Sequence, residues 1–573
     1  VYCRAFLSQE NRVRSTSKAQ QQRITMNIQW MAKNLKNRIV LSSGIISYML
    51  LLLWRIPLSR VIGDEGVGLM APAFEMFVLT TLVTSYGMSN AMAGIIRYRV
   101  KRERYRNAGK VFKTAFVMNL FLGTVMALFL LFFSSWTAET IALERLSRMA
   151  VMAAAPSVFF ASLIGLFRGY FNGYGMGVLT AHSQYIEKTA MFVGAILGGR
   201  AFYGYGQKVA ALLQVEAHSY AYGALGAMLG VFISQVIAVL HLILVYVIYA
   251  GAFKGRPGQD NSRRAETRFE IQRMLIVNMV PLAAAAVCSN LFMLADQRFF
   301  NHCMNMTEQG NVRTAQWGSF YGKFAPLIGI CAAFSCLFVH GLTGKICSAY
   351  EREEYRGMRE RMGRAVRNAS IVSFPAAIYL AVLGKPFSTC CYGRSTAQSA
   401  VLAGWLSKGA VLAALFTFCF LFGQILYKLR MTRELFLTSA ASLAVHLAAA
   451  YFMTQRGHMG VGGLLCALIL FFGIYIVLSF VFLNRRIKYR PDWFAGVLFP
   501  LGAAAVSGLV VYLLNLLLSG VAGAVLCIVI SLPVGVFFHI LFLVILRVIG
   551  ETELQEMPLG FLFIMLGRTI GVF

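Results

Sequence analysis

An arginine lies well inside an apolar run that is long enough to cross a bilayer. The run extends from Ile39 to Ile62, and it contains Arg55 and Pro57. A helix needs about 20 residues to cross a bilayer, and a guanidinium that faces lipid costs at least about 2.5 kcal/mol. Arg55 is therefore expected to face protein, water or a bound anion, as on a transport pathway. The alternatives are that it reaches toward the membrane surface or pairs with an acid between helices.

Two lysines are further candidates for binding a substrate. Lys323 lies in the outer part of the apolar run 316–343, and Lys408 lies in that of the run 397–426. Together with Arg55, these lysines predict a positively charged pathway for an anionic substrate. The alternative for each lysine is an anchor at the membrane interface.

Three acids are candidates for coupling transport to an ion gradient, since a carboxylate that binds a proton or Na⁺ in one state can drive alternating access. Glu75 lies deep in the second apolar run. Asp296 precedes Arg298 near a run's outer end, so an ordinary salt bridge is the favoured alternative. Glu187 adjoins Lys188, and a structural ion pair is favoured there. Coupling to Na⁺, H⁺ or the membrane potential is expected, with no bound cofactor.

Neither a catalytic residue nor a metal site is predicted. The 11 cysteines do not show zinc-type spacing. The turn RGYFNGYGMG lacks the preceding strand and the GK[ST] ending of a phosphate-binding loop. Three histidines, His241, His340 and His446, stand alone in apolar runs and are predicted to be hydrogen-bonded packing residues rather than proton carriers. The sequence therefore indicates a protein that is not an enzyme.

The composition is that of an all-α polytopic membrane protein. Of the 573 residues 58% are hydrophobic and 13% are charged, and the mean hydropathy is +0.66. The net charge of +30 comes from basic clusters between apolar runs rather than from one patch. This distribution is typical of cytoplasmic loops and contacts with membrane lipids, and it argues against a nucleic-acid partner.

About 14 transmembrane helices are predicted from successive apolar runs. When successive loops are assigned to alternate sides of the membrane, about 39 lysines and arginines fall on one side and about 10 on the other. Both termini lie on the side with more of them, so both are predicted to be cytoplasmic. The runs are 39–62, 67–96, 112–134, 149–167, 178–199, 222–250, 274–297, 316–343, 368–387, 397–426, 434–454, 460–483, 493–518 and 521–546.

A repeat in the loops divides the chain into two halves. Long basic connections follow the second and eighth runs, at 97–113 and 344–367, as in transporters built from two six-helix units. Two additional helices follow the second half. The predicted parts are a basic cytoplasmic tail 1–37, a first half 38–250, a linker 251–273, a second half 274–483, two helices in 484–550 and an amphipathic tail 551–573.

Four motifs carry a resemblance to a known family. They are RIPLSRVIGDEGVGL, GMSNAMAGIIRYRV, LFRGYFNGYGMGVLTAHSQYIEK and FYGKFAPLIGICAAFSCLF. In this order they resemble the stage V sporulation protein B-like branch of the multidrug/oligosaccharidyl-lipid/polysaccharide (MOP) exporter superfamily, which is related to lipid II flippases. The likeness extends from about Arg38 to Arg490. One departure is LFVHGLTGKI at the end of the eighth run, where this branch often has a proline.

The resemblance implies two six-helix bundles arranged as a V around a central cavity, with two extra helices. It also implies that a lipid-linked oligosaccharide or a lipid II-like precursor is flipped across the bacterial cytoplasmic membrane, for the cell wall, a capsule or sporulation. Arg55 matches a cavity arginine of the flippases by position, and Glu187 matches the acid of their IE pattern. Cell-envelope biosynthesis proteins are possible partners. The alternatives are a cation-coupled multidrug exporter and, less favoured, a membrane-embedded glycosyltransferase.

Overall fold

The computed structural model describes residues 42–253, 260, 266–306, 312–489, 491–520, 523–555 and 560–573. These residues form helices joined by short connections, and none of them lies in a β-strand. The all-α prediction is therefore confirmed. The predicted N-terminal tail and most of the linker between the halves lie outside the described residues.

The chain begins with two helices that run in opposite directions. A helical segment at 42–53 continues into α2 (Arg55–Thr81), in which Gly63 has φ +75° and ψ 167°. This conformation is open almost exclusively to glycine, and it interrupts the helix. Arg55 lies 3.9 Å from Glu75, although 20 residues of continuous helix would separate them by about 30 Å. The chain therefore reverses near Gly63, between the first two predicted spans.

Each half is a series of long helices, many of them continued by short π-helical turns, named η here. The first half contains α2, η1 (Leu82–Gly87), α3 (Met88–Val100), α4 (Tyr105–Phe132), α5 (Ser134–Trp136), η2 (Thr137–Ile141), the 3₁₀ turn η3 (Arg145–Ser147), α6 (Arg148–Gly173), α7 (Gly177–Leu213), α8 (Ala217–Ile248) and α9 (Ala250–Phe253). The second half contains α10 (Arg268–Cys288), α11 (Phe292–Met306), α12 (Arg313–Ser319), η5 (Phe320–Phe324), α13 (Ala325–Glu351), α14 (Tyr355–Val382), α15 (Gly384–Tyr392), α16 (Ala397–Gly409), α17 (Val411–Lys428), α18 (Thr432–Tyr451), η6 (Phe452–Arg456) and α19 (Gly460–Ile487).

Twelve helical segments among the described residues are long and apolar enough to cross a membrane. The first, Ser42–Val100, contains the reversal near Gly63 and therefore accounts for two predicted spans. The predicted span 178–199 lies within α7, which is not among the twelve because it is less apolar than they are. Each of the other segments matches one predicted run, so the arrangement is consistent with about 14 transmembrane helices.

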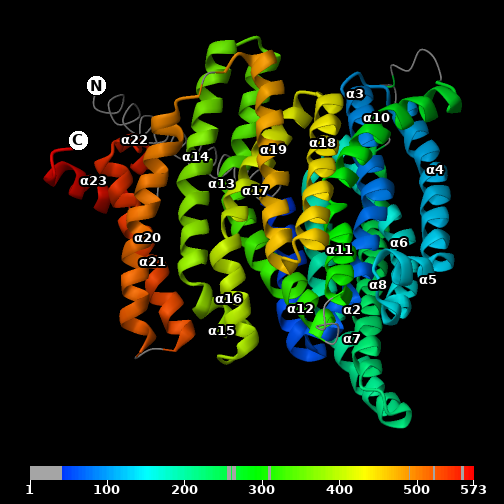
Figure 1. The fold of residues 1–573 in the computed structure, drawn as a ribbon. Helices are drawn as coiled ribbons and strands as arrows, with labels where there is room; N and C mark the ends of the chain where they lie inside the picture. The colour runs from blue at the N-terminus through cyan, green and yellow to red at the C-terminus, as the bar shows by residue number, and fades with distance from the viewer. Residues whose placement is uncertain are drawn as a thin grey trace, which may run out of the picture.

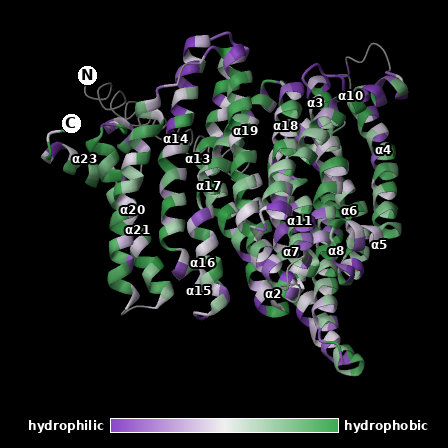
Figure 2. Ribbon diagram, in the orientation of Figure 1, coloured by the Kyte–Doolittle hydropathy of each residue, from purple (hydrophilic) through white to green (hydrophobic). Residues whose placement is uncertain are grey.

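The turns between helices gather at two ends of the molecule (Figure 1). We call the end with the turns 101–104, 352–354 and 429–431 the basic end, and Figure 2 shows hydrophilic residues concentrated there. The opposite end carries the α7–α8 and α20–α21 turns. Hydrophobic residues cover the helices between the two ends, as expected of surfaces that face lipid.

The helices after the second half lie at one side of the molecule (Figure 1). They are η7 (Phe494–Leu498), α20 (Phe499–Ser519), α21 (Ala524–Ile545), α22 (Glu551–Gln555) and α23 (Gly560–Thr569). Helix α23 packs on α21 through Phe563, and its Phe561 and Met565 are exposed. This short helix lies within the predicted tail 551–573, whose amphipathic character stays a prediction.

Glycines allow α7 and α8 to pack backbone against backbone. Gly194 and Gly198 face Gly226 and Gly230, so each helix contributes a GxxxG pair, a spacing that favours close packing in membranes. A Cβ atom on Gly198 would lie 2.3 Å from the carbonyl oxygen of Gly226. Contact at this distance leaves no room for a side chain.

Gly198→Val is therefore expected to destabilise the protein by about 1–3 kcal/mol through overpacking. Gly204→Val is a matched control on the same helix, because no heavy atom lies within 4 Å of its Cβ position. The melting temperatures of both variants are measured by thermal unfolding in detergent. Equal melting temperatures for the two would contradict the close approach of α7 and α8.

Candidate functional site

Two adjoining cavities lie between the halves. The larger has a volume of about 300 Å³ and the smaller about 150 Å³. Both are lined by Tyr48, Asn290, Phe416 and Phe472, so they are parts of one space, which we call the central cavity. Its wall is rich in aromatic rings and also presents side-chain amides and hydroxyls. Such a mixture can hold a ligand that has both apolar faces and hydrogen-bonding groups.

Arg55 lies at the end of the smaller part of the central cavity. Its guanidinium stands 4.1 Å from the ring centre of Tyr321 and 4.9 Å from that of Phe74. Arg55 and Glu75 are 5% and 7% exposed, and the Tyr321 hydroxyl donates a 2.6 Å hydrogen bond to Glu75 Oε1. The arginine therefore faces protein and a cavity, and it also has the acidic partner that the sequence left as an alternative.

The predicted positive charge of the pathway is not found in the described lining of the central cavity. Arg55 and Glu75 are the only arginine, lysine, aspartate or glutamate residues in that lining. The expectation of a net cationic cavity is therefore wrong for the described residues. The physical reason is that the helical reversal near Gly63 brings Glu75 to within 3.9 Å of the guanidinium.

Asp296 on α11 forms a buried pair with His446 on α18. Asp296 Oδ1 lies 2.9 Å from His446 Nε2, and both side chains are fully buried. The imidazole also contacts the rings of Phe292 and Phe471, which line the central cavity. Asp296 Oδ2 has no hydrogen-bond partner among the described residues. The pair therefore lies directly behind the aromatic wall.

The pairing of Asp296 with His446 differs from the salt bridge that the sequence favoured. Arg298, the predicted salt-bridge partner, instead donates to the carbonyl oxygen of Thr140. His446 is hydrogen-bonded and packed between aromatic rings, in line with the predicted packing residue, but its hydrogen-bond partner is an acid. The isolated appearance arose because the partner lies 150 residues away in the chain.

Glu187 takes part in a network within the first half. Arg168 lies 2.7 Å from Glu187 Oε2, Lys188 donates to Oε1, and Gln235 donates a 3.3 Å hydrogen bond to Oε1. These contacts tie α6, α7 and α8 together. Glu187 does not line the described cavities, and the geometry agrees with the structural ion pair favoured from the sequence.

Lys323 joins the two halves at the opposite end. It is 2% exposed, it pairs with Asp64 at the reversal of the first two helices, and it lies 3.9 Å from the ring centre of Tyr392. Tyr392 donates a 2.9 Å hydrogen bond to Asp64 Oδ2. Lys408 is exposed on α16 and lies outside the described cavity linings, so its role in substrate binding stays a prediction.

Further contacts close the opposite end. Arg313 lies 2.7 Å from Glu144, and Thr314 donates a 2.9 Å hydrogen bond to the same carboxylate. Asn301 donates a 2.7 Å hydrogen bond to the carbonyl oxygen of Ala142. Toward the basic end, the central cavity is lined by Tyr427, which donates a 3.0 Å hydrogen bond to Asn90. Charged contacts between the halves therefore concentrate at the opposite end.

Lys323→Met is expected to open this closure, and a cysteine beside it reports the change. Burial raises the pKa of the Cys391 thiol to about 11 and slows its reaction with maleimide. In a variant that retains Cys391 as its single cysteine, opening should speed labelling about fivefold or more. Removing the positive charge of Lys323 would by itself slow the labelling of Cys391. Faster labelling in Lys323→Met would therefore report greater exposure of the Cys391 thiol. The control is Lys385→Met, which lies on α15 together with Cys391. Unchanged labelling of Cys391 in Lys323→Met would contradict the closure.

Several residues of these networks were not singled out from the sequence. Tyr321 stands two residues before Lys323. Asp64 lies in the GDEG segment of the first motif, RIPLSRVIGDEGVGL. A tyrosine and an acid beside glycine in otherwise apolar segments were the available signals. Among the described residues, no cluster of three His, Cys, Asp or Glu side chains is arranged to hold a metal ion.

Comparison of the sequence with known families confirms the predicted resemblance. The pattern of the polysaccharide biosynthesis protein family matches residues 35–280. The chain is 21% identical over 432 residues to stage V sporulation protein B of Bacillus subtilis (strain 168), covering 75% of this chain and 79% of that protein.

Comparison of the fold finds similar solved structures among membrane transporters. The lipid II flippase MurJ in an inward closed conformation aligns with a TM-score of 0.59 at 12% identity, covering 88% of this chain and 97% of that one. A MOP superfamily transporter from Pyrococcus furiosus aligns with a TM-score of 0.57 at 15% identity, covering 79% and 96%. An inward-facing multidrug resistance MATE family transporter gives 0.54 at 14% identity, covering 79% and 94%. The chain thus has the fold of these transporters.

Proposed function

We propose that this protein is a transporter that flips a lipid-linked saccharide across the bacterial cytoplasmic membrane by alternating access. The observation that carries the proposal is the aromatic central cavity between the halves, with a guanidinium at its closed end. The match to the polysaccharide biosynthesis protein family and the likeness to a lipid II flippase support a saccharide rather than another cargo. The solved structures with this fold are described as a flippase and as transporters, which supports transport rather than catalysis.

The basic end is assigned to the cytoplasm, with both termini on that side, because lysines and arginines concentrate in cytoplasmic loops. The charged closure at the opposite end then separates the central cavity from the outside. A substrate made in the cytoplasm would reach the cavity from the basic end. If the contacts at the opposite end break while the helices at the basic end come together, the cavity would open to the outside and expose the substrate there.

The lining of the central cavity suits a saccharide joined to a phosphate. Flat aromatic faces can cover the apolar face of a sugar ring, while Asn290, Gln424 and Ser439 can exchange hydrogen bonds with its hydroxyls. Arg55 Nε has no hydrogen-bond partner among the described residues. A phosphate can therefore engage Arg55 and compete with Glu75 for its charge.

The buried pair Asp296–His446 is proposed as the coupling group. A carboxylate with one unpartnered oxygen can take up a proton or Na⁺, and the change in charge would act on the cavity wall through Phe292 and Phe471. Glu75 is the second candidate, because among the described residues Arg55 is the one cation that pairs with it. Glu187 is held by two cations and is assigned a structural role.

Export of organic cations is the second candidate function, and the aromatic wall and buried Glu75 favour it together with the fold shared with a multidrug transporter. An exporter of cations is expected to have a cavity with excess negative charge. Here one arginine balances one glutamate in the described lining. This balance favours the saccharide over the cation.

Reconstitution into liposomes tests the proposal. Protein is inserted into vesicles that carry a fluorescent lipid-linked saccharide, and the fraction that a membrane-impermeant reagent can quench is followed over time. The protein should speed equilibration between leaflets relative to protein-free vesicles. Absence of flipping together with uptake of an organic cation would replace the proposal with the second candidate.

A further inference from the structure

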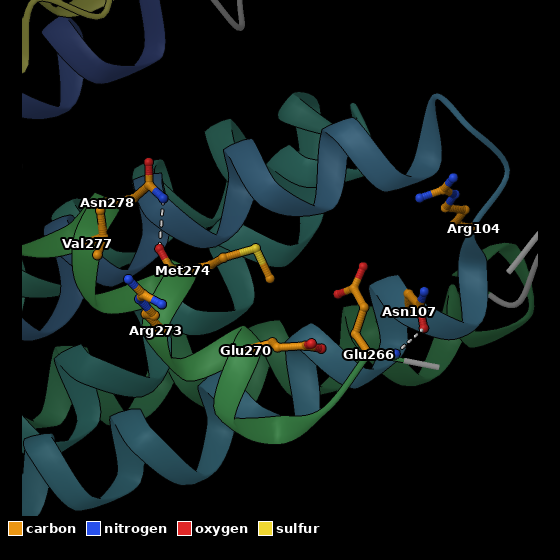
Figure 3. Close-up of a pocket in the computed structure, with 8 residues that line it drawn as sticks. All are labelled: Arg104, Asn107, Glu266, Glu270, Arg273, Met274, Val277 and Asn278. Carbon is orange, nitrogen blue, oxygen red and sulfur yellow. Dashed lines mark hydrogen bonds between the residues drawn. The ribbon is translucent and has the colours of Figure 1, made fainter. Parts of the chain in front are cut away.

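A separate pocket lies at the basic end, away from the central cavity. It has a volume of about 730 Å³ and lies between the start of α4 and the start of α10 (Figure 3). Arg104 stands on one side and Arg273 on the other, with the side chains of Glu266 and Glu270 between them. None of its lining residues lines the central cavity.

The pocket changes from polar to apolar along one face of α10. Its lining residues on this helix recur at helical spacing, from Glu270 through Arg273 to Met274, Val277 and Asn278, and Glu266 lies two residues before the helix. The apolar run predicted to enter the membrane starts at residue 274, and Val277 is 63% exposed. The pocket therefore straddles the boundary between the polar membrane surface and the hydrocarbon.

The acids in the pocket already have partners. Glu266 is held by Arg99, whose guanidinium contacts both of its oxygens, and Glu270 accepts a 2.9 Å hydrogen bond from the backbone N–H of Thr267. Arg104 and Arg273, in contrast, take part in no ion pair among the described residues. The pocket thus presents two guanidinium groups that have no ion-pair partner among the described residues, one carboxylate neutralised by Arg99 and one, Glu270, held by a backbone N–H.

We propose that this pocket binds a lipid with a phosphate-bearing headgroup. Guanidinium groups bind phosphate through charge-assisted, bidentate hydrogen bonds, and basic pockets at the polar ends of transmembrane helices bind anionic lipid headgroups. The phosphate lies between Arg104 and Arg273, and the first carbons of the lipid chain lie along Met274 and Val277. The lipid is either a bulk phospholipid or a polyprenyl-linked lipid, which share this chemistry.

Binding at this pocket connects the two halves. Arg104 precedes α4 of the first half, and Arg273 belongs to α10, the first helix of the second. A lipid that contacts both arginines stabilises the arrangement of the halves at the basic end, because a ligand favours the state that it binds better. The site therefore makes the conformational equilibrium sensitive to the lipids of that leaflet.

Native mass spectrometry of the full-length protein in detergent tests the proposal. Retention of phosphatidylglycerol, phosphatidylcholine and a polyprenyl diphosphate is compared between wild type and Arg104→Gln/Arg273→Gln. The control is Arg364→Gln/Arg433→Gln, which removes two exposed arginines of the second half. Unchanged gel-filtration profiles verify that the variants are folded.

The pocket variant should retain at least one of the two anionic lipids about tenfold less well, with the control unchanged. The lipid that loses affinity identifies the source, and both losing affinity supports the shared chemistry. Equal retention of both anionic lipids by wild type and pocket variant would overturn the proposal, as would wild-type retention of phosphatidylcholine equal to theirs. These outcomes do not depend on flipping, so they remain separate from the test of the proposed function.

Discussion

Arg55→Ala should abolish transport and destabilise the protein by about 3–5 kcal/mol, since removing one member of a buried ion pair leaves the other charge uncompensated. Glu75 would keep its 2.6 Å hydrogen bond from Tyr321, but its cation at 3.9 Å would be gone. Thermal unfolding in detergent and flipping in liposomes measure the two effects. Both effects follow from the position of one guanidinium between an acid and a cavity.

A double variant separates the two roles of Arg55. Arg55→Met/Glu75→Gln removes both charges and keeps similar volumes, so most of the lost stability should return. Transport should stay at least about tenfold below wild type, because no guanidinium remains for the substrate phosphate, and a charge-assisted contact is worth roughly 1.5–3 kcal/mol. A stable double variant that transports like wild type would show that Arg55 serves only to balance Glu75.

Asp296→Asn should uncouple transport from the ion gradient. A difference of one pH unit across the membrane stores about 1.4 kcal/mol per proton. This free energy can sustain up to about a tenfold excess of substrate in one leaflet. The variant cannot lose a proton from this group, so the substrate should only equilibrate between leaflets. Liposomes with an imposed pH or Na⁺ gradient measure this distribution, and they also identify the coupling ion.

Glu360→Gln provides the control, because Glu360 is exposed and pairs only along its own helix with Arg356. His446→Gln is informative as well, since it keeps a polar group near Asp296 but cannot carry a proton. If Asp296→Asn still supports a gradient-dependent excess, Asp296–His446 is a packing interaction. In that case Glu75 becomes the coupling candidate.

Much of this molecule could be predicted from local patterns in the chain. Apolar runs of bilayer length and the alternation of basic loops depend only on neighbouring residues, so they indicated the helical class, about 14 spans and the two ends. Arg55, well inside the first run, marked the candidate site for the same reason, because the cost of burying a charge does not depend on knowing its partner.

The partners themselves were decided by the tertiary structure. Glu75 reaches Arg55 because the backbone reverses at Gly63, Lys323 reaches Asp64 across the two halves, and Asp296 reaches His446 between α11 and α18. A helical pattern fixes which residues share a face but not which face meets which neighbour. The sign of the cavity depended on that pairing, so a sequence with excess positive charge folds around a balanced lining.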